Sequence, residues 1–184
     1  DGSKTHKWVL EGLFGECERV TKTDDLIKEG YLSKFRIKVL LCKHAPQHFE
    51  SYHDEMEYLV EHKGRNNLIK NLVNDLEGNT LVLFNYVEKH GDPLYELINS
   101  TIDPERKLFF VHGGTDVEDR EEVRQITETE SNAIIVASYG TFSTGINIKR
   151  LHNIVFASPS KSRIRNLQSI GRVLRKGEGK DIAT

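Results

Sequence analysis

The chain has 184 residues and a mass of 21.1 kDa, which allows one domain with a hydrophobic core plus a fragment of a neighbour but excludes two full domains. Hydrophobic residues make up 37% and charged residues 29%, with 4 prolines and 14 glycines, so disordered, collagenous and low-complexity classes are excluded. The net charge is −2, the two cysteines are too few for a disulfide scaffold, and neither a membrane helix of ~18 apolar residues nor a signal peptide is present.

The first 45 residues do not share the pattern of the rest of the chain. Lys7–Phe14 is apolar but mixed, and Thr23–Gly30 has the spacing of a short capped helix that Gly30 closes. We interpret this section as a tail or linker that follows something else.

Five short runs rich in β-branched or aromatic residues are predicted strands. They are Arg36–Cys42, Thr80–Tyr86, Lys107–His112, Asn132–Ser138 and Asn153–Ala157. The last four are nearly continuous apolar stretches, which indicates strands that are buried on both faces, as in a parallel sheet.

Helical patterns alternate with these strands. They are Asn67–Leu76, a helix that opens at Asp92-Pro93, Asp116–Thr127 and Arg163–Arg175. The alternation predicts an α/β fold with three layers, in which helices cover both faces of a mostly parallel sheet.

Positive charge is concentrated in the last fifth of the chain. From Lys149 onward there are nine of the 26 Lys and Arg residues but only two of the 28 acidic residues. Such a block indicates either an anion site, for phosphate or nucleic acid, or a basic helix face in solvent.

The last predicted helix carries an unusual polar face. Gln168, Gly171, Arg172 and Arg175 are spaced i, i+3, i+4 and i+7, so they share one side, opposite an expected apolar stripe. That stripe comprises Ile164, Leu167, Ile170 and Leu174. Two guanidinium groups one turn apart suit a phosphoryl group, and the competing reading is a basic face paired with Glu178 or a nearby acid.

Small residues also gather in Ala137–Ile148, which directly follows the most apolar strand and is predicted to be a loop. Exposed amides and hydroxyls in such a loop can hold phosphates, and a turn without a function is the alternative.

Together, GTFSTGIN and QSIGRVLR resemble motifs V and VI of superfamily 2 helicases and translocases, and residues 80–180 resemble their second RecA-like domain. Within this superfamily, the sequences of these two motifs are most similar to those of the phage UvsW-type recombination DNA helicases. Residues 1–45 then resemble the end of the first RecA-like domain and the interdomain linker, and residues 46–184 a second RecA-like domain truncated at its C-terminus.

The resemblance implies a role for each motif residue. Arg172, Arg175 and Gln168 would act on the γ-phosphate of ATP. The residues implied next to the bound ATP are Gly145, Asn147 and Gly171. Those implied at the DNA backbone are His112, Gly113, Ser138 and Thr141.

No phosphate-binding loop of the form GxxxxGK[ST] and no acidic box for magnesium occur in the sequence. The resemblance therefore implies that ATP and Mg²⁺ are bound mainly by the first domain, and that this chain alone is inactive. No metal ligand set is recognised here, because His44, His48 and His53 lack partners at suitable spacing.

The expected partners are single-stranded or branched DNA and the first RecA-like domain, with no membrane. The expected setting is recombination or repair in the cytoplasm of a bacterial or phage-infected cell. The alternative is a non-catalytic module with the same fold that binds nucleic acid or docks a partner.

Overall fold

The structure, a computed structural model, describes residues 4–18, 20–144 and 148–184. The chain divides into two compact units, residues 1–32 and 33–184, which are described separately. The expected domain boundary after residue 45 stays a prediction. In the described part of the chain, no helix is both long and apolar enough to cross a membrane.

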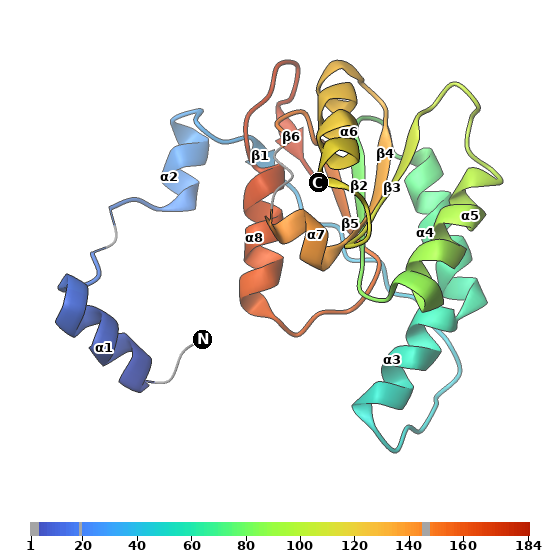
Figure 1. Cartoon of the computed structure of the whole chain (residues 1–184), viewed down its shortest axis with the longest axis horizontal. Helices are drawn as coiled ribbons and strands as arrows, with labels where there is room; N and C mark the ends of the chain where they lie inside the picture. The colour runs from blue at the N-terminus through green and yellow to red at the C-terminus, as the bar shows by residue number, and fades with distance from the viewer. Residues whose placement is uncertain (1–3, 19, 145–147) are drawn as a thin grey trace. The chain divides into compact units, whose positions relative to one another are not determined.

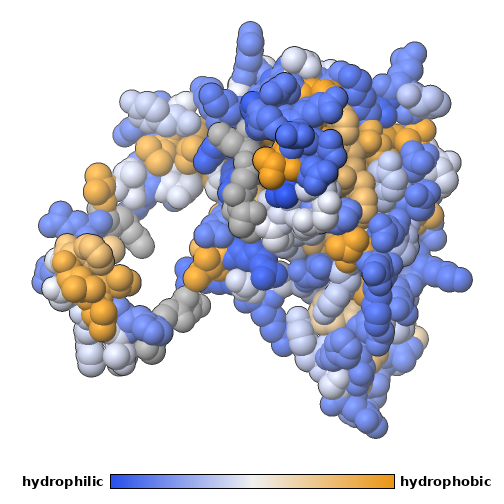
Figure 2. All heavy atoms as spheres, viewed as in Figure 1, coloured by the Kyte–Doolittle hydropathy of each residue, from blue (hydrophilic) through white to orange (hydrophobic). Residues whose placement is uncertain are grey.

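In its described residues, the first unit contains the helices α1 (Lys4–Phe14) and α2 (Thr23–Lys28). The predicted stop after α2 is confirmed, because Gly30 adopts a positive φ of 80° that favours glycine. Apolar side chains gather on the surface of α1 (Figure 2), where Trp8 and Phe14 are largely exposed.

The second unit is built on a parallel sheet whose four strands run in the order β3-β4-β2-β5. The strands are β2 (Thr80–Phe84), β3 (Leu108–Val111), β4 (Ile134–Ser138) and β5 (Asn153–Phe156). All three pairings are parallel, as the continuous apolar runs predict.

A short strand pair extends this sheet beyond β5. Strands β1 (Lys34–Phe35) and β6 (Ile182–Ala183) pair in parallel. Thr184 joins them to β5, because its carbonyl accepts from the N–H of Ile154 at 2.9 Å and its N–H donates to the carbonyl of His152 at 3.0 Å.

The strand expected over Arg36–Cys42 is wrong: the ladder stops where the N–H of Arg36 donates to the carbonyl of Ala183, and residues 37–42 form no strand. Their partner β6 is only two residues long, so the apolar side chains that follow find no continuing ladder. Ile37, Val39 and Leu41 are accordingly exposed.

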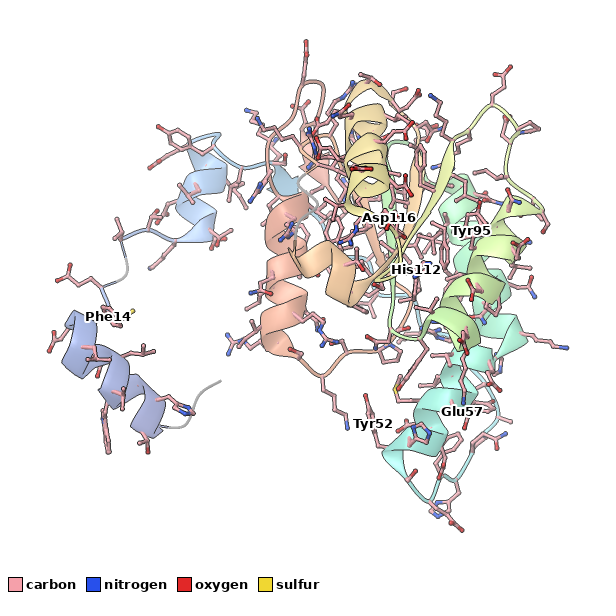
Figure 3. The ribbon with its side chains drawn as sticks, viewed as in Figure 1. Phe14, Tyr52, Glu57, Tyr95, His112 and Asp116 are labelled. Atoms are coloured by element: carbon pink, nitrogen blue, oxygen red, sulfur yellow. The ribbon has the colours of Figure 1, made fainter. Side chains whose placement is uncertain are left out.

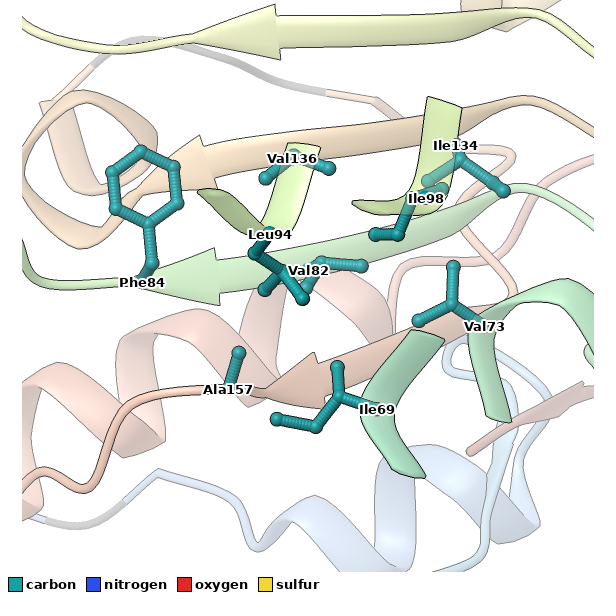
Figure 4. Packing of buried hydrophobic residues seen from close by; sticks show 9 residues of the cluster. All are labelled: Ile69, Val73, Val82, Phe84, Leu94, Ile98, Ile134, Val136 and Ala157. Carbon is teal, nitrogen blue, oxygen red and sulfur yellow. The ribbon is translucent and has the colours of Figure 1, made fainter. Parts of the chain in front are cut away.

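Helices cover both faces of the sheet (Figure 1), which confirms the three-layer α/β fold. On one face lie α4 (Lys63–Asp75) and α5 (Asp92–Asn99), and on the other lie α6 (Val117–Thr129), α7 (Tyr139–Thr144) and α8 (Arg163–Val173). Between the sheet and the first pair of helices, a buried cluster forms the core (Figure 4). It contains Ile69, Val73, Val82, Phe84, Leu94, Ile98, Ile134, Val136 and Ala157.

Two further elements were not predicted. Helix α3 (Tyr52–Glu61) begins after Ser51, whose hydroxyl accepts from the N–H of Asp54 at 3.2 Å and caps the helix. A π-helical turn, η1 (Val87–Gly91), leads into α5 and buries His90.

Candidate functional site

Helix α8 ends at Val173, two residues short of the helix predicted over Arg163–Arg175. Gln168, Gly171 and Arg172 lie on the helix, whereas Arg175 follows in the turn after it. The helix begins after Ser162, whose hydroxyl accepts from the N–H of Arg165 at 3.3 Å. Gln168, Gly171 and Arg175 are exposed and Arg172 is half-buried. A Cβ atom added at Gly171 would meet no atom within 4 Å, so nothing packs on the helix backbone at this position.

The apolar stripe expected on α8 is only partly right. Ile164 and Leu167 are 50% and 54% exposed, whereas Ser169, Val173 and Leu174 are buried. The buried face is thus narrower than the sequence pattern suggests, and it admits Ser169 because the hydroxyl of that residue donates to the carbonyl of Arg165 at 3.0 Å.

The burial pattern of α8 predicts effects of different size for two alanine substitutions. Val173→Ala is expected to lower the free energy of unfolding by about 2 kcal/mol, because it removes buried methyl groups and leaves a cavity. Leu167→Ala is expected to change it by less than about 0.5 kcal/mol, because that side chain is mostly in water. Urea denaturation of both variants measures the difference, and equal losses would contradict the packing described here.

Arg172 rests on the neighbouring helix. Its guanidinium carbon lies 5.4 Å from the ring centroid of Phe142, a buried residue of α7. Burial, and next the charge of Arg175, lowers the pKa of Arg172. The positive charge of Arg175 therefore acts on the guanidinium of Arg172.

Phe142 is a site residue that the sequence did not reveal. The segment around it was expected to be a loop, but α7 starts directly after β4 and Phe142 comes from its second half. The only sign of Phe142 in the sequence was an aromatic residue among small ones. Its contact with Arg172 follows from the packing of α7 against α8.

Ser138 and Thr141 cap the start of α7. Their hydroxyl oxygens lie 2.8 Å apart, and the N–H of Thr141 donates to Ser138 Oγ at 3.3 Å. Both residues are buried. Their expected contact with nucleic acid stays a prediction, and the expected ATP contacts Gly145 and Asn147 lie outside the described residues.

His112 and Gly113 begin an exposed turn at the end of β3 (Figure 3). The ring nitrogen Nδ1 of His112 accepts from the N–H of Gly114 at 3.1 Å, so the neutral ring carries its proton on Nε2. Arg120 holds the turn from α6, because its Nε donates to the carbonyl of Thr115 at 2.9 Å.

The sheet register brings these segments together. Val111 pairs with Ala137, so His112 and Ser138 leave the sheet side by side at its carboxyl edge, where ligands gather in parallel α/β folds. The exposed turn and α7 therefore lie at the same edge of the sheet. Phe142 of α7 contacts Arg172 of α8, so this edge adjoins the proposed arginine site.

Residues 64–177 match the helicase conserved C-terminal domain family. The chain belongs to this family. This helicase C-terminal domain is also 36% identical, over 94% of its length, to the ATP-dependent DNA helicase uvsW of enterobacteria phage T4. It spans about a third (35%) of that relative.

Two solved structures support the fold of the helicase C-terminal domain. The crystal structure of T4 UvsW matches 73% of this chain and 27% of its own with a TM-score of 0.61 and 35% identity. The ATP-dependent Type ISP restriction-modification enzyme LlaBIII, solved bound to DNA, matches 94% of this chain and 13% of its own with a TM-score of 0.65 and 20% identity. The domain thus has the RecA-like α/β fold expected from its motifs.

Proposed function

We propose that the chain is the C-terminal motor domain of an ATP-dependent DNA helicase or translocase and supplies the arginine half of its ATP site. The observation that carries the proposal is the position of Arg172 on α8, against the ring of Phe142, with Arg175 three residues further on in the turn that ends the helix. The similarity to a phage DNA helicase supports ATP and DNA as the ligands.

The residues of α8 suit the triphosphate end of ATP. The planar guanidinium of Arg172, oriented by the ring of Phe142, would donate to γ-phosphate oxygens, and Arg175 would add a second positive charge. Gln168 would contribute an amide on the same side, and Gly171 would leave room for the nucleotide. Gly145 and Asn147 are the proposed ribose contacts.

The chemistry proposed for this half of the site is electrostatic. When ATP is bound, its γ-phosphoryl group gains spread negative charge during transfer, and fixed arginines stabilise that charge. Magnesium would be held by the first RecA-like domain. This chain's part is to close over the nucleotide from the second side of the cleft.

The exposed turn at His112-Gly113 is the proposed contact to the DNA backbone. Its glycine admits a close approach, and the Nε2 proton of His112 can donate to a phosphate oxygen. Ser138 and Thr141 lie beside this turn and hold α7 in place. Contacts of this kind recognise phosphates and not bases, so we expect little sequence specificity.

Complementation tests this function. We expect ATP hydrolysis only when the chain is combined or fused with a first RecA-like domain that carries a phosphate-binding loop, and we expect DNA to stimulate it. Each part alone should be inactive. If the combination binds DNA in a salt-sensitive manner but never hydrolyses ATP, the chain is a non-catalytic binding module and the proposed function is wrong.

A further inference from the structure

A buried lysine lies at the end of the arginine helix. Lys180 is only 1% exposed, although lysine is among the residues that are least often buried. Its ammonium group donates to the main-chain carbonyls of Val173 and, at 2.8 Å, Arg175, and it reaches the carbonyl of Lys149 at 3.4 Å.

The three carbonyls match what an ammonium group requires. An ammonium group has three protons to donate, and here each finds an acceptor inside the protein. Burial lowers the pKa of Lys180 to about 8, so the group is mostly charged at neutral pH. Carbonyls at the C-terminal end of a helix carry partial negative charge, so a cation is stabilising there.

Lys180 connects α8 to a segment that is itself fixed. The N–H of Lys149 donates to Glu128 Oε1 at 2.8 Å, and the guanidinium of Arg150 donates to the carbonyl of Glu128 at 3.1 Å. The end of α6 therefore holds the Lys149 carbonyl in place. Lys149 also follows within two residues of Asn147, one of the proposed ribose contacts.

The turn that carries Lys180 passes close to this segment. A Cβ atom added at Gly177 would lie 2.9 Å from the carbonyl oxygen of Lys149, so the backbone can approach this closely only with glycine at that position. The N–H of Lys180 donates back to the carbonyl of Gly177 at 3.2 Å and closes the turn.

We propose that Lys180 is a positioning residue, which sets the end of α8, and with it Arg172 and Arg175, against the Lys149 segment. The inference rests on the proposed function, because Arg172 and Arg175, whose position it maintains, are residues proposed to contact ATP. Lys180 touches no nucleotide in this scheme. It acts through the carbonyls of Val173, Arg175 and Lys149.

Hydrogen exchange of the 184-residue chain tests the contact without ATP. In Lys180→Met, which keeps an unbranched side chain only one atom shorter but removes its donors, we expect amides at the end of α8 and near Lys149 to exchange at least roughly tenfold faster. Amides of β2 and β4 should keep their protection. Lys63→Met, which removes an exposed lysine of α4, is the control and should exchange as the parent does.

A second variant keeps the ammonium group and displaces the turn. Gly177→Ala forces the turn away from the Lys149 carbonyl, so we expect faster exchange in the same two places. Unchanged exchange at the end of α8 in both variants would overturn the proposal. Faster exchange throughout the sheet would overturn it as well, since Lys180 would then support the whole fold and not the position of one helix.

Kinetics of the assembled motor test the functional half. For Lys180→Met we expect kcat for ATP hydrolysis to fall roughly tenfold or more with KM for ATP unchanged, because misplaced groups affect the transition state more than binding. An unchanged kcat, while Arg172→Ala abolishes hydrolysis, would overturn the positioning role alone. If Arg172→Ala also leaves kcat unchanged, the proposed function is wrong. Hydrogen exchange would then still show whether Lys180 fixes the end of α8.

Discussion

Replacing Arg172 with alanine is expected to lower kcat for ATP hydrolysis by the assembled motor by roughly 10³-fold or more. The guanidinium is already oriented on Phe142, 5.4 Å from the ring centroid, so little reorganisation is needed when charge develops on the phosphoryl group. Steady-state hydrolysis at saturating DNA measures the effect. Binding of a fluorescent ATP analogue should be nearly unchanged, since the first domain holds most of the nucleotide.

Two further variants make this prediction specific. Arg172→Lys keeps a positive charge but loses the planar pair of donors and the stacking on Phe142, so we expect it to restore little of the activity. Arg163→Ala removes an exposed arginine at the start of the same helix and should leave hydrolysis close to the parent value. An equal loss in the Arg163 and Arg172 variants would mean that the general charge of α8 matters and not the pair.

Acidification from about pH 7 to about pH 5 is expected to cost the parent chain roughly 2 kcal/mol more of its unfolding free energy than it costs a His90→Gln variant. His90 is fully buried, and burial, followed by the charge of Arg65, lowers its pKa from 6.5 to about 4. Between these two values the unfolded chain binds a proton that the folded chain does not, so stability falls as the pH falls.

The hydrogen bonds of His90 explain why the neutral ring is preferred. Its Nε2 lies 3.2 Å from Asn66 Oδ1, and its Nδ1 lies 2.8 Å from the hydroxyl of Ser158, to which the N–H of Asn85 donates. The amide nitrogen of Asn66 donates to the carbonyl of Val60 at 2.8 Å, which leaves its oxygen as the acceptor for His90. The neutral ring therefore donates from Nε2 and accepts at Nδ1.

Urea denaturation at both pH values measures the effect in the parent and in His90→Gln. The difference between the two proteins isolates His90, because the other titrating groups, such as His152, are common to both. The same loss of stability in both proteins would contradict a neutral, buried His90.

The four strands of the main sheet could be predicted from the sequence because each is a short apolar run. The expected burial on both faces holds for the central strands β2 and β4, whereas β3 and β5, at the edges of the four-stranded sheet, are only partly buried. Residues of β2 and β4 are buried without exception, and such runs have few alternative structures. The helix that opens at Asp92-Pro93 was likewise predictable, since proline in the first turn is a local signal. The spacing of Arg172 and Arg175 could also be seen in the sequence, because it too is a local feature.

Other features depend on contacts between distant parts of the chain. The run after Arg36 has the composition of a strand, but the pairing of β1 with β6 ends there. Ile164 and Leu167 follow a helical period, yet α8 packs through Ser169 and Val173. The sequence shows which side chains favour burial, but the surface that each element packs against decides which of them are buried.

The sequence by itself determined the α/β alternation, the parallel sheet and the arginine spacing, because these follow from periodicity and from charges only a few residues apart. Only the tertiary structure decided that Phe142 supports Arg172 and that Lys180 holds the end of α8. Both contacts join segments that approach each other through the packing of α7, α8 and the turn after it. No local pattern encodes such an approach, since it is set by the burial of surfaces that lie far apart along the chain.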